Sequence, residues 1–360
     1  MSLKKVTYLI KEQPKNAAAY NRVRMLVDGL NNNGISSNII FIPKTGNSKF
    51  LYYTRYILLL VRLYFIFFFS NKKKAIILYG EDTILKSLVK FPRRCLLIAE
   101  RTEYSTYLFD DSLSPQHVAS IKTFEENLKY VDAMIVCSVA LENYYKQFCD
   151  KPICRVPLVY EESFIKQNKS KDNHTIVYCG DMGGGKDGVD ILIKSFAIFN
   201  KSVPGYRLIL IGGTSKPNVM DTLNQMTVDL GVSQNVSFTG WIRREEMPSY
   251  LETASLLVLS RPANKQAEGG IPSKLAEYLS TGRPVLTTKV GDLPLFFTNG
   301  KDLFFAEPDS VDDFSEKMIS IFRDYNYSCI VGQNGIETVK QFDRNVQSLN
   351  MITFINSLLG

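Results

Sequence analysis

A glycine-rich segment that follows a predicted strand is the first feature of the chain with chemical potential. Residues 178–188 read Tyr-Cys-Gly-Asp-Met-Gly-Gly-Gly-Lys-Asp-Gly. The segment begins at the last residue of the apolar run Ile176–Tyr178. Glycines allow close approach of the backbone to a ligand, and the helix expected to begin near Gly188 offers free N–H groups and a positive dipole end. Lys186 adds a positive charge. The segment is neither a P-loop nor a GxGxxG fingerprint, but it suits a diphosphate; the alternative is a glycine loop without a ligand.

A second segment, residues 268–285, places a carboxylate on a short helix. We expect Ser273 to cap this helix and Gly282 to end it before a strand at Val285. Glu277 then lies one turn into the helix. A carboxylate accepts two hydroxyl hydrogen bonds at once, which suits the diol of a ribose or another sugar. The alternative is an exposed glutamate paired with a neighbouring lysine.

Strand and helix patterns alternate along the whole chain, interrupted by the polar segment 156–174. Short apolar runs are typical of parallel strands that are covered on both faces, and here they are Val6–Ile10, Ser37–Phe41, Ala75–Leu78, Leu96–Ala99, Ala133–Val136, Ile176–Tyr178, Leu208–Ile211, Val236–Thr239, Leu256–Leu259 and Val285–Thr288. The pattern predicts two doubly wound α/β domains, with ligands at the carboxyl ends of the strands and in the cleft between the domains. We predict a first domain over residues 1–160, a second over 161–345, and a C-terminal helix, 346–360, that packs back on the first domain.

Composition and cysteine usage indicate a globular, intracellular protein. The 360 residues are 45% hydrophobic and 22% charged, which is ordinary for globular domains. The six cysteines form no CxxC pair and the chain has two histidines, so no metal site is expected. Unpatterned cysteines indicate reduced thiols and a cytoplasmic location. The apolar run near the N-terminus is too short for a secretory signal.

Residues 50–74 combine a long apolar stretch with basic flanks. The stretch FLYYTRYILLLVRLYFIFFF spans Phe50–Phe69 and precedes three lysines, and residues 1–74 hold 13 Lys/Arg against Glu12 and Asp28. Arg62 near its centre disfavours a spanning helix, whereas an interfacial helix tolerates it. We predict contact with a membrane surface, the inner face of the membrane for a cytoplasmic protein. The alternative is a buried helix of the first domain; nucleic acid is not expected, because the aromatics are not interleaved with basic residues.

Three blocks of the C-terminal half together resemble glycosyltransferase family 4. They are YCGDMGGGKDGVDILIKSFAIF (178–199), VSFTGWIRREEMPSYLETASLLVLS (236–260), and the block from Glu268 extended through Gly291. The resemblance implies the GT-B fold, two Rossmann-like domains that face a central cleft, and a retaining, metal-independent transfer from a UDP- or GDP-sugar without a further cofactor. Catalytic roles would fall to Glu268 and Lys186. The donor-binding residues it implies are Gly180, Gly183, Gly184, Gly185, Lys186, Gly240, Trp241, Gly269, Gly270, Ile271 and Glu277.

The chain departs from the family pattern at two positions. The family separates its two glutamates by seven residues, whereas eight lie between Glu268 and Glu277. The family also places an arginine after the first glycine of the loop, where this chain has Asp181. A carboxylate beside a diphosphate is unfavourable, so it must point away and another cation must substitute. The candidates are Arg243, Arg244 and Arg261.

The acceptor side is marked by one charged segment of the first domain. Glu100, Arg101 and Glu103 follow the predicted strand Leu96–Ala99 in what we expect to be a loop, where a glutamate could orient an acceptor hydroxyl and the arginine could meet a phosphate. With the membrane segment, this suggests a saccharide or lipid-linked acceptor in bacterial polysaccharide synthesis. Two alternatives are a catalytically silent sugar-nucleotide binding module and another GT-B enzyme, such as a nucleotide-sugar epimerase.

Overall fold

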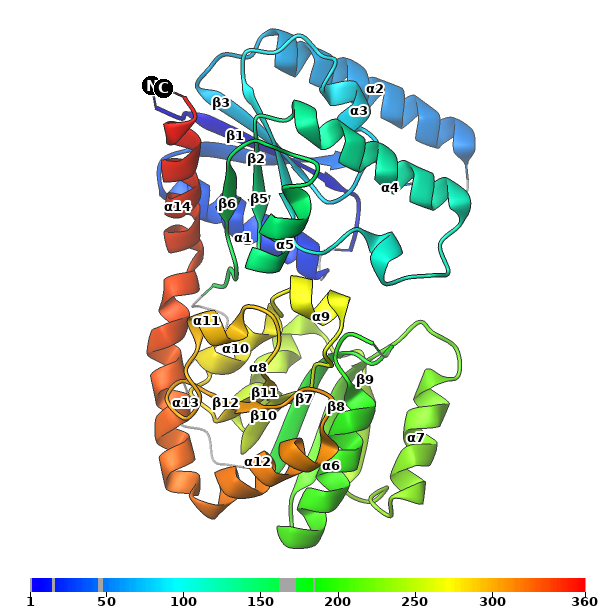
Figure 1. The fold of residues 1–360 in the computed structure, drawn as a ribbon, viewed down its shortest axis with the longest axis vertical. Helices are drawn as coiled ribbons and strands as arrows, with labels where there is room; N and C mark the ends of the chain where they lie inside the picture. The colour runs from blue at the N-terminus through cyan, green and yellow to red at the C-terminus, as the bar shows by residue number, and fades with distance from the viewer. Residues whose placement is uncertain (1, 15–16, 45–47, 162–172, 184, 360) are drawn as a thin grey trace. The chain divides into compact units, whose positions relative to one another are not determined.

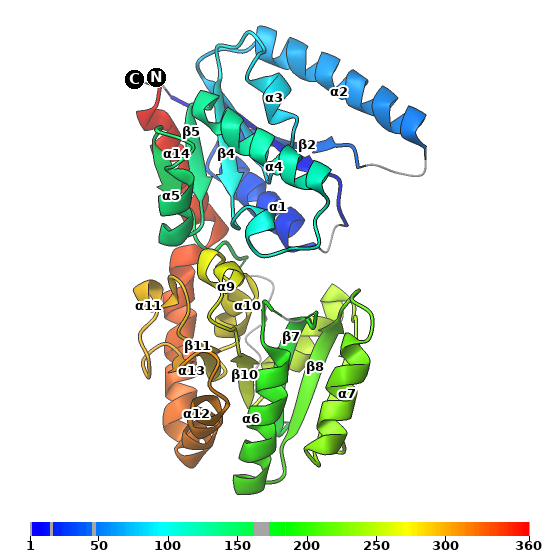
Figure 2. The same ribbon diagram turned by 45° about the vertical axis from the view of Figure 1, so that its right-hand side comes forward.

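The computed structural model describes residues 2–14, 17–44, 48–161, 173–183 and 185–359. The chain divides into two compact units, the first formed by residues 1–160 with 342–360 and the second by residues 161–341. Each unit contains a six-stranded sheet in which all neighbouring strands are parallel (Figures 1 and 2). The prediction of two doubly wound α/β domains is therefore confirmed.

The first unit has the strand order β2-β1-β3-β4-β5-β6. Its elements are β1 (Lys5–Lys11), α1 (Ala18–Asn32), β2 (Ser36–Ile42), α2 (Lys49–Phe68), β3 (Lys74–Tyr79), α3 (Leu85–Leu88), β4 (Leu96–Arg101), the 3-10 turn η1 (Thr106–Leu108), α4 (Pro115–Asn127), η2 (Leu128–Tyr130), β5 (Ala133–Val136), α5 (Val139–Tyr145), β6 (Ile153–Arg155) and, from the end of the chain, α14 (Arg344–Ser357).

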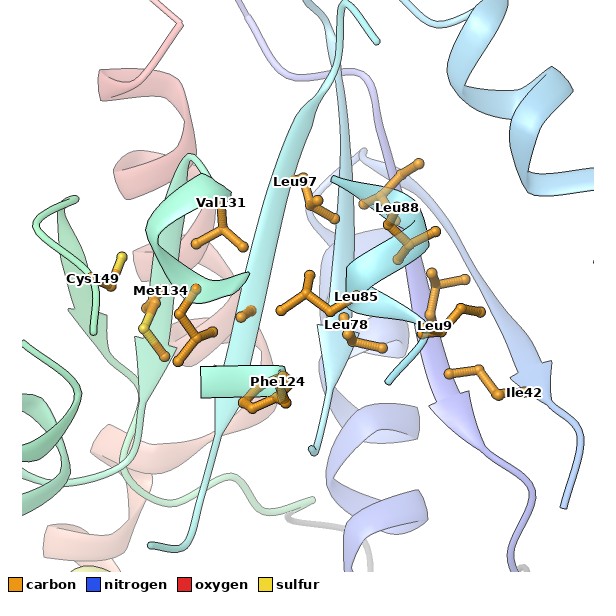
Figure 3. Close-up of a cluster of buried hydrophobic side chains, with 14 of the residues drawn as sticks. Leu9, Ile42, Leu78, Leu85, Leu88, Leu97, Phe124, Val131, Met134 and Cys149 are labelled. Atoms are coloured by element: carbon orange, nitrogen blue, oxygen red, sulfur yellow. The ribbon is translucent and has the colours of Figure 1, made fainter. Parts of the chain in front are cut away.

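Two hydrophobic clusters cover the two faces of the first sheet. Alternate residues of a strand point to opposite faces, so Leu9 lies in the cluster with α2, α3, α4 and α5, and Tyr8 in the cluster with α1 and α14. Figure 3 shows the first of these clusters, in which strand residues such as Leu78 and Leu97 meet Leu85 and Phe124 of the helices. Helices and apolar side chains therefore cover most of both faces, as the continuous apolar runs predicted.

The second unit has the order β12-β11-β10-β7-β8-β9. Its elements are β7 (Thr175–Asp181), α6 (Val189–Ser202), β8 (Arg207–Gly213), α7 (Val219–Asp229), β9 (Val236–Gly240), η4 (Arg244–Glu246), α8 (Met247–Glu252), β10 (Leu256–Leu259), α9 (Lys265–Gly269), α10 (Lys274–Ser280), β11 (Val285–Thr288), α11 (Leu293–Phe296), β12 (Phe304–Ala306), α12 (Val311–Arg323) and α13 (Tyr325–Val339), with the turn η5 (Lys340–Phe342) at the unit boundary. Numbered within the unit, this is the order 3-2-1-4-5-6, and its topological switch point lies between β7 and β10.

Helix α2 leaves most of its apolar surface exposed. Only Leu59, Leu63 and Phe67 of the helix are buried. By length and composition alone, α2 could cross a membrane: the mean hydropathy of its most apolar 18-residue window is 1.4. Only 17% of that window is buried. A core helix of a soluble domain would bury far more, so the alternative of a simple core helix fits the structure poorly.

Candidate functional site

The loops after β7 and β10 meet at the switch point of the second sheet, where ligands of doubly wound folds bind. After β7, the chain passes through the glycine segment and enters α6 at Gly188. This glycine adopts a left-handed conformation, with φ of +57°, and no side chain caps the helix. The first N–H groups of this fourteen-residue helix lie at the positive end of its dipole. They donate no hydrogen bond to a capping side chain. This is the local structure that favours an anion.

Ser260 and Asn264, from the loop after β10, hold the glycine segment in place. The hydroxyl of Ser260 donates to the carbonyl oxygens of Asp187 (3.1 Å) and Gly188 (2.8 Å). The side-chain amide of Asn264 donates to the carbonyl of Gly185. A Cβ at Gly188 would collide with the Ser260 carbonyl, so the close approach of the two loops requires glycine there.

Asp181 turns back on its own loop. Its carboxylate accepts a hydrogen bond from the N–H of Gly183, and the side chain is otherwise exposed. A Cβ at Gly183 would clash with this carboxylate and with the hydroxyl of Thr214. The negative charge is thus partly satisfied by the backbone.

A buried charge cluster centred on Asp187 joins the two loops. Its carboxylate pairs with Lys274 and lies 3.8 Å from Arg261, and it accepts a hydrogen bond of 2.9 Å from the hydroxyl of Tyr178. Burial alone would raise the pKa of Asp187, but the charges of Lys274 and Arg261 and the hydrogen bonds together hold that pKa below its ordinary value. Asp187 is therefore ionised at neutral pH.

Lys274 was not identified as a site residue from the sequence. Its ammonium lies 4.9 Å from the centre of the Tyr178 ring, and a Cβ at Gly180 would collide with it. Gly180 immediately precedes Asp181, the position at which the family's arginine is missing. The ammonium of Lys274, on α10, therefore lies beside that position. Lys274 and its partner Asp187 are 87 residues apart in the sequence.

The three arginines considered as substitutes have different surroundings. Arg261 is buried, and it donates to the carbonyl oxygens of Gly270 (2.6 Å) and Lys186 (3.4 Å). Arg244 pairs with Glu277 at 3.1 Å, whereas Arg243 is largely exposed and pairs with Glu246 at 2.7 Å. Arg261 thus fixes the backbone of both loops, and Arg244 joins η4 to α10.

Glu277 lies in the first turn of α10 with a quarter of its side chain exposed. Burial raises the pKa of its carboxyl above the ordinary value, against the opposing charges of Arg244 and Lys274. The next residue, Tyr278, accepts a hydrogen bond of 2.7 Å from the N–H of Cys179. Glu277 is thereby held at the carboxyl end of β7. The expectation that Ser273 caps this helix is wrong: Ser273 has helical dihedral angles and makes no capping hydrogen bond.

The remaining predicted donor residues lie at or after the carboxyl ends of β9 and β10, strands of the same sheet. Glu268 lies on α9, about half exposed, 3.5 Å from Lys265. Gly269 is buried, and Gly270 and Ile271 are partly exposed in the turn toward α10. Gly240 adopts a φ of +69° at the end of β9, and the exposed ring of Trp241 lies against Gly213 at the end of β8.

Lys186 lies partly buried in the glycine segment. Gly184 lies outside the described residues. Burial raises the pKa of Cys179, at the end of β7, to about 11, so this thiol is protonated at neutral pH. Among the described residues, no group of three or more His, Cys, Asp or Glu side chains is arranged to hold a metal ion.

The predicted acceptor residues of the first unit lie partly within a strand, which corrects their placement in a loop. β4 continues through Arg101 because both charged side chains find buried partners. Glu100 pairs with Arg22 at 2.8 Å and accepts a hydrogen bond of 2.8 Å from Tyr8. Arg101 donates to Tyr145 (2.8 Å) and Glu81 (3.0 Å), and to the carbonyl oxygens of Glu103 and Tyr104. Of the three predicted residues, only Glu103 lies beyond the strand, partly exposed.

Comparison with known structures identifies the class of fold. The chain is similar to HepE from Anabaena, solved in complex with UDP and glucose, with a TM-score of 0.74, 13% identity, and coverage of 98% of this chain and 100% of that chain. At this identity the likeness concerns the fold alone. The chain has the GT-B fold of glycosyltransferases.

Sequence comparison supports one family within that class. Residues 173–324 match the model of glycosyl transferases group 1. Mannosylfructose-phosphate synthase of Agrobacterium fabrum is 26% identical over 164 residues, 44% of this chain and 35% of that protein. A GDP-mannose-dependent alpha-(1-6)-phosphatidylinositol monomannoside mannosyltransferase of Mycobacterium tuberculosis is 25% identical over 157 residues, 43% of this chain and 40% of that protein. The matches thus span well under half the length of these relatives, and the match to the family model lies within the second unit.

Proposed function

We propose that the protein is a retaining glycosyltransferase, and that its second unit binds the nucleoside diphosphate of a UDP- or GDP-sugar. The observation that carries this proposal is the start of α6, which no side chain caps and which follows the glycine segment with Lys186 at the switch point. The group 1 match covers the same residues. A binding site with this chemistry favours a diphosphate over a neutral ligand.

Lys186 and the amides around Gly183–Gly185 would hold the diphosphate, and Lys274 would supply the second cation. The ammonium of Lys274 lies beside Gly180. Arg261 instead donates to backbone carbonyls, and Arg243 pairs with Glu246. Lys274 also pairs with Asp187, so a bound diphosphate would share this ammonium with a buried carboxylate. In this assignment a lysine of α10 takes the place of the family's arginine at position 181.

Glu277 would accept hydrogen bonds from the ribose hydroxyls, and Gly240 with Trp241 would border the base. Arg244 now holds the Glu277 carboxylate, so ribose binding would share or displace this ion pair. Glu268, Gly269, Gly270 and Ile271 would face the transferred sugar. Arg261 supports this turn through the carbonyl of Gly270.

The proposed reaction exchanges one bond at the anomeric carbon of the sugar. The bond to the diphosphate oxygen breaks, the acceptor oxygen bonds to the same face, and the acceptor proton passes to the departing diphosphate. Fixed charges and amides around Lys186 would stabilise the negative charge that develops on the leaving group. Retention, independence of metal and the absence of a cofactor remain parts of this proposal.

The proposed acceptor is a saccharide or lipid-linked hydroxyl in bacterial polysaccharide synthesis, reached at the cytoplasmic face of a membrane. Support comes from the exposed apolar side of α2 and from the lysines that follow it. Neutralising Arg55 and Lys72–Lys74 should reduce flotation of the protein with anionic liposomes, since basic residues near such a surface add about 1 kcal/mol each. Unchanged flotation would contradict the membrane contact.

The enzymatic proposal is tested by release of nucleoside diphosphate from UDP- and GDP-sugars in the presence of saccharide and lipid-linked acceptors. Lys186→Ala and Glu277→Ala should each lower kcat/KM at least a hundredfold, because both lose contacts to the donor. Lys201→Ala, an exposed lysine near the end of α6, should leave it unchanged. The proton NMR spectrum of the product should show the anomeric configuration of the donor.

Asp181 favours one alternative, a silent sugar-nucleotide binding module, because it places a carboxylate where the family has a cation. Nucleotide binding that depends on Lys186, without release of diphosphate under any acceptor condition, would favour this module. Interconversion of free nucleotide sugars would instead favour an epimerase.

A further inference from the structure

A cavity of about 510 Å³ lies in the first unit between α2 and the sheet. Its walls come from β1, β2, β3 and the C-terminal half of α2. This volume lies within the range of about 300–1,000 Å³ that small-molecule sites occupy. The cavity belongs to neither the donor site nor the charged end of β4.

Polar residues on the sheet explain why α2 does not close on it. Lys5 and Thr7 point to the same face as Leu9, and Lys74 is the neighbour of Lys5 in the parallel register. Asn38 of β2 accepts a hydrogen bond of 3.1 Å from the hydroxyl of Thr7. A strand covered on both faces normally carries apolar residues throughout. Here the strands instead present polar side chains to an apolar helix.

The cavity is lined by both cationic and apolar side chains. Lys5, Arg62 and Lys74 line it, and no acidic side chain does. Within the described part of the chain, none of these three side chains forms an ion pair or a hydrogen bond. The apolar lining includes Ile40, Ile76 and Ile66. Such a lining complements an anionic amphiphile.

The apolar lining is continuous with the exposed surface of α2. Phe65 and Phe69 line the cavity and are also 53% and 69% exposed. Figures 1 and 2 show α2 along one outer side of the first unit. The two rings stack on each other, so a ligand that enters the cavity would pass beside exposed aromatic rings, as an acyl chain drawn from a bilayer would.

We propose that this cavity binds one anionic phospholipid. The phosphate pairs with Lys5 and Lys74, which are neighbours in the strand register, and Arg62 adds to the positive charge of the lining. An acyl chain follows Ile40, Ile76 and Ile66 beneath the helix. This inference goes beyond sugar transfer and does not depend on it. It also differs from general attraction to a charged surface, because it requires a saturable site with one lipid per chain.

The test uses the full chain and short-chain dioctanoyl phosphatidylglycerol below its micellar concentration, with stoichiometry from native mass spectrometry and affinity from calorimetry. The expected result is one lipid per chain. The double variant Lys5→Gln/Lys74→Gln should bind at least tenfold more weakly, and Ile66→Trp, which fills the cavity without changing charge, should do the same. Lys86→Gln/Lys122→Gln removes two exposed lysines of the same unit and should bind as the wild type does.

Three results would overturn the proposal, provided that circular dichroism shows the variants to be folded. The first is the absence of saturable binding. The second is an equal loss in the two double variants, which would indicate net charge alone. The third is equal binding of dioctanoyl phosphatidylcholine, or binding of inorganic phosphate as tight as that of the lipid. Should one cavity variant fail to fold, the other and the Arg62→Gln variant, on an exposed helix position, still decide the question.

Discussion

Asp187 is the residue through which the loops after β7 and β10 are connected. Its carboxylate contacts Lys274, Arg261 and Tyr178, and it is nearly buried. An ion pair in such a position is costly to break, because the remaining charge is left in a poorly solvated environment. The cluster therefore controls both local stability and the position of Lys274.

Replacing Asp187 should change the pH dependence of stability. The folded pKa of Asp187 lies below its unfolded value of about 3.9. Its contribution is thus present above that value and lost as pH falls through the folded pKa. Asp187→Asn should lower the free energy of unfolding by about 3 kcal/mol at pH 7, with the difference shrinking below pH 4 in urea titrations. Asp190→Asn, an exposed partner of Lys194, should cost under about 1 kcal/mol. A constant difference at all pH values would contradict this account.

Lys274 should matter for the diphosphate and not for the nucleoside. A charge-assisted hydrogen bond contributes about 1.5–3 kcal/mol, so Lys274→Met should weaken UDP or GDP binding about tenfold to a hundredfold. Binding of uridine or guanosine should be unchanged, which a general loss of structure would not produce. Equal weakening of nucleoside and nucleoside diphosphate in calorimetry would show that Lys274 is only structural.

The position of the glycine loop between a strand and a helix could be predicted from its sequence, whereas the buried partners could not. The segment that contains Lys186 can be recognised from its glycines and from its place after a strand. The pairing of Lys274 with Asp187 depends on two loops that only the strand order brings together, and no local spacing reveals it. The same holds for Glu100 and Arg101, whose charges suggested a loop but whose partners Arg22 and Tyr145 extend the strand.

At the scale of elements, the entry of the chain into α6 depends on one backbone conformation. Gly188 combines a positive φ with contact to the carbonyl of Ser260, so two separate constraints exclude a side chain. The sequence predicted the helix start, because a glycine precedes an apolar pattern of period 3.6. It could not predict the contact with the loop after β10.

Gly188→Ala should destabilise the second unit more than a matched glycine substitution. Gly231 follows α7 with φ of +69° and has open space around its Cβ position. Gly231→Ala should therefore cost only the left-handed strain, about 1–2 kcal/mol. Gly188→Ala should exceed this by at least about 1 kcal/mol from steric overlap and should weaken nucleotide binding. Equal losses in denaturant titrations would contradict the proposed packing.

At the scale of the molecule, the end of the chain completes the first unit. α14 packs on α1, where a Cβ at Gly29 would collide with the carbonyl of Arg344 (Figure 1). Met351 and Ile355 belong to the core cluster of the first sheet. A truncated protein without this helix would expose that face of the first unit.

Met351→Ala should therefore destabilise the first unit. Truncation of a buried methionine costs about 2–5 kcal/mol, and hydrogen exchange should accelerate in β1 and α1. Leu349→Ala, on the exposed side of the same helix, should have an effect below about 0.5 kcal/mol. Faster exchange confined to the second unit would contradict this assignment.

The most direct test of the central claim is thermal stabilisation of the protein by UDP, GDP and ADP. A ligand at a hundred times its Kd stabilises the folded state by about 2.7 kcal/mol. We predict a clear rise in Tm with at least one nucleotide, lost in Lys186→Ala and Glu277→Ala and kept in Lys201→Ala. No stabilisation of the wild-type protein by any of the three nucleotides would contradict a nucleotide-sugar site in the second unit.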